Sequence, residues 1–292
     1  MFTHPSLSKC LELIDQIHQQ SFGKNYGLLL TGLSGVGKTY LAKAYQARFP
    51  TVCTPEVNYY PVIYVKLTET KTATDFLIQI VKSLTSVIGK SANKAHIVQD
   101  RLAVLLTAHR VQLIIIDEVQ ECLTDIDGIT SQRMAKQIAA LLDNNPKVSV
   151  ILMGTPVASR LLRLKYGKLT HRLKGEEQLS RRFLSEQRLH IIPSRCECWL
   201  LCCNYCATQL GLPPFTLNNK PILNRLHVAT DGRIGLLTKL FAIASSSKHK
   251  NLLAKLEDAY LLGINSSAYN PFDTIALSDD DIIGILDSRE FD

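Results

Sequence analysis

Residues 32–39 read Gly-Leu-Ser-Gly-Val-Gly-Lys-Thr, which fits the pattern G-x-x-x-x-G-K-[ST] of a phosphate-binding loop. The glycines let the backbone curl so that its amide groups, and the start of the following helix, face phosphate oxygens. Lys38 is expected to reach the β- and γ-phosphates of a nucleotide, and the Thr39 hydroxyl to bind Mg²⁺. The expected nucleotide contacts are Gly32, Ser34, Gly35, Val36, Gly37, Lys38, Thr39 and Tyr40.

An acidic pair, Asp117 and Glu118, closes the apolar run 113–116. Beside a phosphate loop, we expect Asp117 to hold Mg²⁺ and Glu118 to orient and deprotonate the attacking water. An adjacent Glu favours hydrolysis of a nucleoside triphosphate over phosphate transfer to a small molecule. The other interpretation is an acidic pair that merely ends a strand at the surface, and the paired phosphate loop argues against it.

A further apolar run, 148–153, ends in Gly154-Thr155-Pro156. In ATPases that insert a strand between the two motifs above, a polar residue at this place senses the γ-phosphate. Thr155 is the candidate sensor. A threonine that simply forms a turn before a proline is the alternative.

The elements that must position these residues alternate between strands and helices from residue 26 to about 192. This order predicts an α/β fold of the P-loop kind, with a parallel sheet flanked by helices. The strands are expected at 26–30, 62–67, 113–116, 148–153 and 189–192. After Pro193 the strand signals stop and short helical patterns follow.

Three regions are therefore expected. Residues 1–193 form an N-terminal helix and an α/β nucleotide-binding domain, and residues 194–265 form a small all-helical lid. Residues 266–292 form an acidic tail, because the last twenty residues carry six Asp and one Glu against a single basic residue, Arg289.

The composition fits a soluble globular protein, with 46% hydrophobic and 20% charged residues. The net charge of +7 permits a polyanionic partner. No apolar run approaches the roughly 20 residues that cross a bilayer, and Glu12 and Asp15 interrupt the N-terminal segment. We therefore expect a cytoplasmic protein without a membrane partner.

Five of the eight cysteines cluster in residues 196–206 as C-x-C-x3-C-C-x2-C. The usual zinc-ligand spacings are not met. The cluster also has the apolar spacing of a helix, and a free cysteine packs as a small apolar residue. We favour packing, with a zinc site as the alternative.

Five segments, GLSGVGKT, IIIDEVQE, VILMGTPVASRLL, EQLSRRF and DGRIGLLTKLF, follow one another over residues 25–245. In this order the chain resembles the AAA+ ATPases of transposition, the TniB- and TnsC-like family, which includes members from CRISPR-associated transposons. Such proteins bind ATP and Mg²⁺, assemble head-to-tail into rings or helical filaments on double-stranded DNA, and recruit a DDE transposase. Some act beside a target-selection protein. The resemblance implies a transposition regulator with slow, assembly-dependent ATP hydrolysis.

The resemblance also assigns roles to basic residues. Arg181 and Arg182 match the family's arginine segment, and one of them would reach the γ-phosphate in a neighbouring subunit. Arg233 stands where a lid residue approaches the nucleotide. Contacts with the DNA backbone are expected from Lys82, Lys90, Lys94, Arg133 and Lys136. A solvated basic surface is the alternative for each of these side chains.

Two further functions stay open at this stage. One is a DNA-remodelling or loader AAA+ ATPase that has no transposase partner. The other is an adaptor that switches with bound nucleotide and hydrolyses almost none of it.

Overall fold

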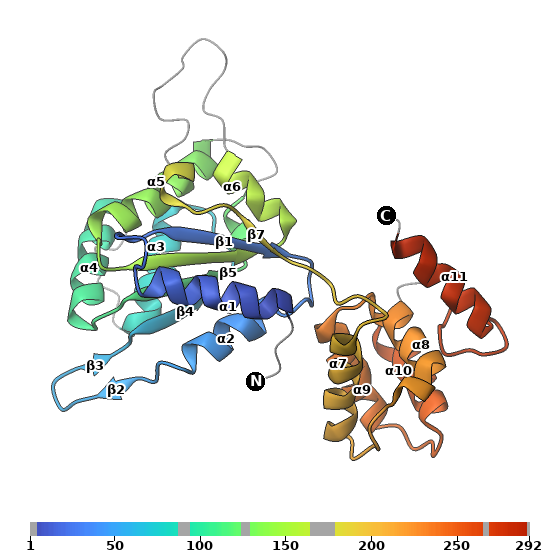
Figure 1. Cartoon of the computed structure of the whole chain (residues 1–292). Coiled ribbons are helices and arrows are strands. Elements are labelled where there is room, and N and C mark those ends of the chain that lie inside the picture. The colour runs from blue at the N-terminus through green and yellow to red at the C-terminus, as the bar shows by residue number, and fades with distance from the viewer. Residues whose placement is uncertain (1–4, 87–93, 124–128, 164–178, 265–268, 291–292) are drawn as a thin grey trace, which may run out of the picture. The chain divides into compact units, whose positions relative to one another are not determined.

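The computed structural model describes residues 5–86, 94–123, 129–163, 179–264 and 269–290 (Figure 1). Its contacts divide the chain into two compact units. The first comprises Thr3–Gly32 and Lys38–Leu189, and the second comprises Leu33–Gly37 and His190–Asp292. Among the described residues, no helix combines the length and the apolar character needed to span a membrane.

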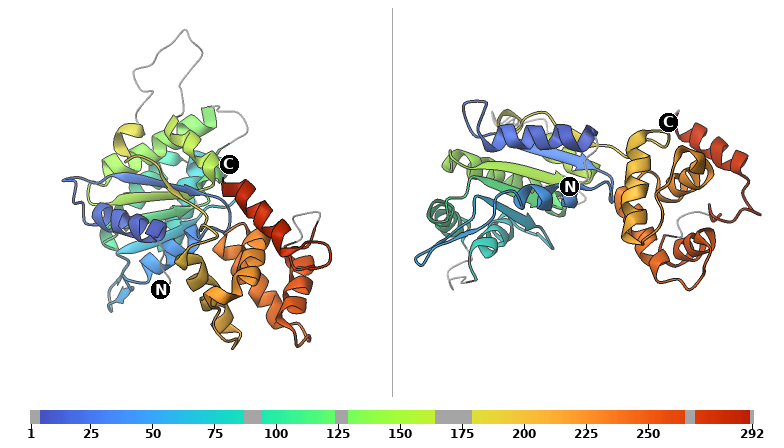
Figure 2. Two further views of the ribbon diagram at one scale, coloured as in Figure 1. Left: turned by 45° about the vertical axis from the view of Figure 1, so that its right-hand side comes forward. Right: turned by 60° about the horizontal axis from the view of Figure 1, so that its bottom comes forward.

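The first unit is built on a five-stranded parallel sheet with the order β4-β5-β6-β1-β7 (Figure 2). Every residue of its three inner strands is buried, because parallel strands are covered on both faces. This burial explains the unbroken runs of Leu, Ile and Val. The strands are β1 (Gly27–Gly32), β4 (Val62–Lys66), β5 (Leu113–Asp117), β6 (Ser149–Gly154) and β7 (Gln187–Leu189).

Helices flank this sheet, which confirms the predicted P-loop α/β fold. Helix α3 illustrates how the sequence sets a helix boundary: the Thr72 hydroxyl accepts from the Asp75 amide, and the Asp75 carboxylate accepts from the Thr72 amide. The helices are α1 (Pro5–His18), α2 (Lys38–Gln46), α3 (Ala73–Leu84), α4 (Ala95–Ala108), α5 (Ile129–Asn144) and α6 (Arg160–Arg163). Short 3-10 helices are η1 (Val119–Cys122), η2 (Pro156–Ser159) and η3 (Ser180–Arg182).

Two details differ from the predicted elements. Residues 51–61, where no strand is expected from the sequence, contain an antiparallel pair, β2 (Val52–Cys53) and β3 (Asn58–Tyr59). Strands of two residues are too short for an alternating pattern to reveal them. The last strand of the sheet, β7, ends at Leu189, which is the residue where the expected strand 189–192 begins.

The second unit is helical. Its elements are α7 (Glu197–Gln209), the 3-10 helix η4 (Leu217–Asn219), α8 (Lys220–Thr230), α9 (Ile234–Ser245), α10 (Leu252–Gly263) and α11 (Asp279–Glu290). The cysteine-rich segment is α7, in which Cys202, Cys203 and Cys206 are buried with Trp199 in the core of this unit. Burial raises the pKa of the Cys202 and Cys203 thiols, as expected for packed apolar groups. These three cysteines thus pack as apolar side chains, the interpretation that the sequence favours. Among the described residues, no group of three or more metal-ligating side chains is found.

The acidic C-terminal segment is part of the second unit rather than a separate tail. The buried Arg225 donates to the carbonyl oxygens of Pro271 (2.6 Å) and Leu277 (2.9 Å) and pairs with Asp279 (2.6 Å). In α11, Ile282 and Leu286 are buried at helical spacing. Residues 269–290 thus fold, although their many carboxylates are typical of a solvated tail. Three of these acids occupy the first turn of α11, where their negative charge interacts favourably with the helix dipole and stabilises the helix.

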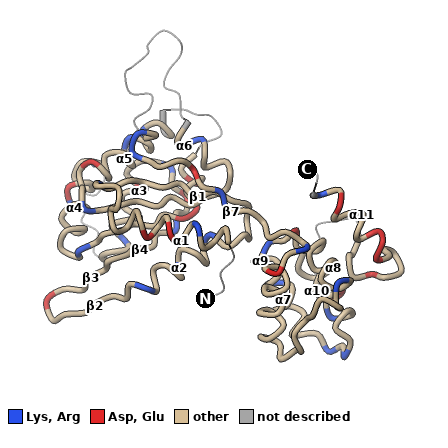
Figure 3. The backbone as a smooth tube through the Cα atoms, viewed as in Figure 1, with Lys and Arg blue, Asp and Glu red and all other residues tan. Residues whose placement is uncertain are grey.

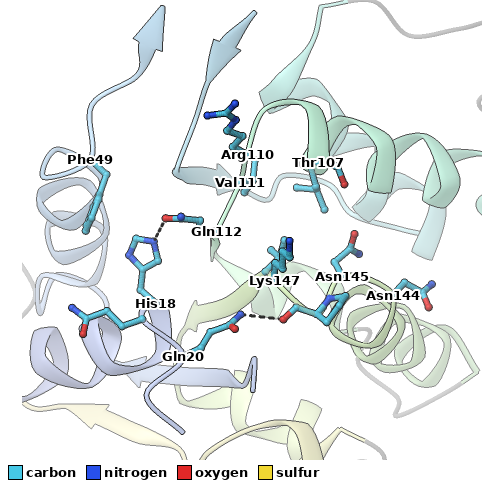
Figure 4. A pocket seen from close by; sticks show the side chains of 14 residues that line it. His18, Gln20, Phe49, Thr107, Arg110, Val111, Gln112, Asn144, Asn145 and Lys147 are labelled. Carbon is cyan, nitrogen blue, oxygen red and sulfur yellow. Dashed lines mark hydrogen bonds between the residues drawn. The ribbon is translucent and has the colours of Figure 1, made fainter. Parts of the chain in front are cut away.

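A cavity of about 910 Å³ lies in the first unit at the amino ends of the strands (Figure 4). Gln112 and Val148, which line it, immediately precede β5 and β6. His18 hydrogen-bonds with Gln112 (3.1 Å) across this end. The predicted phosphate loop and acidic pair lie instead at the carboxyl ends of the strands, so this cavity is separate from the predicted nucleotide site.

Candidate nucleotide-binding site

The phosphate loop connects the end of β1 to the start of α2. Gly35 (φ +85°) and Gly37 (φ +106°) occupy backbone conformations that favour glycine, which explains the fixed Gly37 of the pattern and the glycine at the variable position 35. Lys38, the first residue of α2, is buried, and its ammonium group donates to the carbonyl oxygen of Gly32 (2.7 Å). Burial lowers the pKa of Lys38, and the nearby Asp117 and Glu118 carboxylates oppose that shift. The loop therefore brings a cation to the edge where phosphates are expected.

The Asp117 carboxylate is the centre of this edge. It is 1% exposed and accepts from the Thr39 hydroxyl (2.6 Å), the Tyr64 hydroxyl (2.8 Å) and the amide of Glu118 (2.9 Å). Thr39 and Asp117, the two expected Mg²⁺ ligands, thus touch each other. A hydroxyl and a carboxylate are oxygen ligands of the type that Mg²⁺ prefers, so the residues fit this ion.

Glu118 follows at the end of β5 in a left-handed conformation (φ 58°, ψ 39°). Its carboxylate accepts from the side-chain amide of Gln120 (2.5 Å), and the oxygen of the same amide accepts from the backbone N–H of Thr155 (3.0 Å). Thr155 follows β6, the strand beside β5. The Gln120 side chain therefore bridges the expected base, Glu118, and the expected sensor, Thr155.

Tyr64 and Gln120 complete the site, although neither is among the expected site residues: Gln120 lies in the segment IIIDEVQE, and Tyr64 lies outside the quoted motifs. Tyr64 lies on β4 opposite Ile115 of β5, so the strand register carries its hydroxyl to Asp117. The hydrogen bond to Asp117 and burial raise the pKa of Tyr64, with burial the larger cause, so its hydroxyl remains a donor. A lone tyrosine within the apolar run 62–67 was the only signal of this role in the sequence.

The structure distinguishes between the two candidate arginines. Arg182 forms a bidentate ion pair with Asp143 of α5, with both distances at 2.7 Å. Arg181 is exposed. Arg182 is thus engaged within its own unit.

Arg233 lies beside Gly35 within the second unit, to which the loop segment Leu33–Gly37 belongs by its contacts. The amide of Gly235 donates to the carbonyl oxygen of Gly35 (2.7 Å), and a Cβ on Gly235 would lie 3.0 Å from the Gly35 Cα. The Nε atom of Arg233 is buried without a hydrogen-bond partner among the residues described. An orphaned donor beside the phosphate loop suits an anionic ligand.

The basic residues expected to contact DNA are partly grouped. Arg133 and Lys136 on α5 are exposed and, with Lys71, line a cavity of about 600 Å³ at the start of α3. Figure 3 marks basic positions along α5 in blue on the backbone trace. Lys94 is the exposed N-cap of α4, one residue before Ala95, which also lines this cavity. Lys82 is exposed in the last turn of α3, and Lys90 lies outside the described residues.

Comparisons with known proteins agree with this architecture. Residues 23–162 match the family described as an AAA domain, a span that includes the phosphate loop, the acidic pair and Thr155. None of the curated proteins compared with the chain matches it.

Several solved structures share the fold. The Walker-type ATPase paby2304 of Pyrococcus abyssi aligns with a TM-score of 0.56 at 16% identity, over 89% of this chain and 71% of that one. The ORC2 protein of Aeropyrum pernix, in ADPNP and ADP complexes, gives 0.58 at 14% identity, over 93% and 70%. The FIGL-1 AAA domain with ADP gives 0.51 at 15% identity, over 96% and 88%. The solved structures show a shared fold, and neither they nor the family match single out the TniB- and TnsC-like family.

The Tyr64 contact generates a prediction about the metal. Tyr64→Phe removes one donor from the Asp117 carboxylate while keeping the ring, so we expect the Mg²⁺ concentration for half-maximal ATP binding to rise by about 10-fold, as for other groups that orient a metal ligand. Titration of Mg²⁺ against a fluorescent ATP analogue measures this. Tyr59→Phe, a tyrosine on β3, is the matched control. An unchanged Mg²⁺ requirement in Tyr64→Phe would contradict the role.

Proposed function

We propose that this protein is a Mg²⁺-dependent ATPase of the AAA+ kind. The observation that carries the proposal is the buried Asp117 carboxylate in contact with Thr39, next to the phosphate loop and Lys38. The nucleotides named with two of the similar structures, ADPNP and ADP, support the same ligand class here.

Each residue then has a role in hydrolysis. The loop amides and Lys38 bind the phosphates, and Thr39 and Asp117 hold the Mg²⁺, which would neutralise charge on the phosphate oxygens. Glu118 orients a water and accepts its proton as that water attacks the γ-phosphorus, while the bond from the γ-phosphorus to the bridging oxygen breaks and ADP leaves. Thr155, which follows β6 at the same edge, contacts the γ-phosphate. Arg233, with its unpartnered Nε, contacts the nucleotide.

We further propose that hydrolysis depends on assembly with a second copy of the chain. One of the two arginines, Arg181 or Arg182, is the proposed residue that acts on a neighbour's nucleotide, and Arg182 would have to leave Asp143 to do so. An arginine offered in trans would offset the charge of the transferring phosphoryl group. A single copy would hydrolyse ATP slowly.

Double-stranded DNA is the proposed surface for this assembly. Lys71, Arg133 and Lys136 gather on one cavity at the start of α3, with Lys94 next to it. Exposed cations grouped in this way suit phosphates of the DNA backbone, which they would bind without reading sequence. Lys82 and Lys90 are also proposed to contact the DNA backbone, on the basis of the sequence resemblance alone.

The resemblance of the motifs to transposition ATPases supports the finer proposal. ATP-dependent oligomers on DNA would recruit a DDE transposase, beside a target-selection protein. A loader ATPase without a transposase is the competing function. Incubation of the DNA-bound protein with purified transposases encoded near it separates the two: we expect retention of a transposase only with ATP. Equal retention with ADP, or none, would favour the loader.

The acidic pair generates a prediction that separates an ATPase from a nucleotide-switched adaptor. Glu118→Gln should bind ATP as the wild type does and lower kcat by at least about 100-fold, because a general base contributes that much. Lys38→Ala should lose ATP binding itself. Phosphate release and equilibrium binding measure the two effects. If the wild type releases phosphate no faster than Glu118→Gln, the protein is an adaptor.

The basic cavity generates a prediction about salt. Arg133→Ala combined with Lys136→Ala should reduce the slope of log K against log salt concentration by about 1.8, because each lost phosphate contact contributes about 0.9. The matched control removes the same charges, Arg110→Ala with Lys147→Ala, at the amino ends of the strands. Fluorescence anisotropy with duplex DNA at several salt concentrations measures the slope. Equal slopes for the two double variants would show that this cavity is not part of the DNA-binding surface.

A further inference from the structure

One side-chain amide, that of Gln120, joins the two groups that act on the γ-phosphate. Its nitrogen donates to Glu118 Oε2 (2.5 Å), and its oxygen accepts from the amide N–H of Thr155 (3.0 Å). Both ends of the amide are used, and they reach the carboxyl ends of two adjacent strands, β5 and β6. Gly154 leaves room for this bridge, because a Cβ there would lie 2.7 Å from the Gln120 oxygen.

The backbone under this bridge is fixed. Glu118 occupies the left-handed region (φ 58°), which side-chain-bearing residues rarely adopt. The 3-10 helix η1 that follows is anchored by Val119 and Cys122, which are both buried. The direction of the Glu118 side chain is therefore set by the backbone, and its terminal carboxylate is set by Gln120.

The chemistry of the two groups makes the bridge significant. A carboxylate has two oxygens and can accept about four hydrogen bonds, so the single bond to Oε2 leaves Oε1 able to accept from water. The charge-assisted bond fixes the plane of the carboxylate. The oxygen of the Gln120 amide accepts from the Thr155 N–H and so fixes the distance between the Glu118 carboxylate and Thr155. Thr155 follows the neighbouring strand.

We propose that Gln120 is a positioning residue that couples the Glu118 base to Thr155, so that the two groups keep one geometry around the γ-phosphate. The proposal rests on the ATPase function proposed above. It assigns Gln120 no contact with the nucleotide. Its side chain acts through Glu118 and the Thr155 backbone.

The first test is kinetic. Gln120→Leu should lower kcat by about 10- to 100-fold, the cost of a small misplacement of reacting groups, with KM and the melting temperature close to those of the wild type. Gln120→Asn, one methylene shorter, should lose the bridge and behave likewise. Glu121→Ala, in the same 3-10 helix and exposed, is the matched control and should keep wild-type kcat.

A double-mutant cycle shows whether Gln120 acts through Glu118. In a Glu118→Gln background, Gln120→Leu should lower kcat no further, because residues that act as one unit are not additive. A loss equal to that in the wild-type background, or a wild-type kcat for Gln120→Leu alone, would overturn the proposal.

The second test does not need hydrolysis, so it separates a failure of this coupling from a failure of the ATPase function. Without nucleotide, Gln120→Leu should speed hydrogen exchange of the Thr155 amide by about 3- to 10-fold, the effect of one lost hydrogen bond. Glu118→Ala should also speed it, although Glu118 has no hydrogen bond to that amide in the described residues. Glu121→Ala should not. An unchanged Thr155 exchange rate in Glu118→Ala would disprove the coupling, whether or not the protein hydrolyses ATP.

Discussion

The hydrogen bond from the Thr39 hydroxyl to the Asp117 carboxylate is the contact on which the site depends. It joins the start of α2 to the end of β5, two segments 78 residues apart in the chain. A buried carboxylate is costly unless it is hydrogen-bonded, and Tyr64 and the Glu118 amide supply the remaining donors. Around this group, the parallel strands bring the loop 32–39 after β1, Glu118 after β5 and Thr155 after β6 to one edge of the sheet.

The strand order explains why separate motifs meet. β5 and β6 are adjacent, and β1 lies next to β6. These three strands therefore end side by side, at the loop 32–39, the acidic pair 117–118 and Thr155. The cavity at the opposite end of the strands carries amides and two cations but none of these groups. Catalytic chemistry is thus proposed for one edge of the sheet alone.

Local patterns in the sequence predicted the sheet and the flanking helices, because strand runs and helical spacing are short-range features. The parts that were not predicted depend on register and tertiary packing. Tyr64 reaches Asp117 only through its alignment with Ile115. Arg182 meets Asp143 across 39 residues, and Arg225 holds a C-terminal segment whose acidic composition alone is typical of a solvated tail. The roles of Arg181, Arg233 and the basic cavity remain predictions.

Diffraction from crystals of the protein with Mn²⁺ and ADPNP tests the central claim most directly, because the anomalous signal locates the ion. The account predicts one Mn²⁺ beside the Thr39 hydroxyl and the Asp117 carboxylate, with the nucleotide phosphates in the loop 32–39. Mn²⁺ bound away from both residues, or a nucleotide outside this loop, would contradict it.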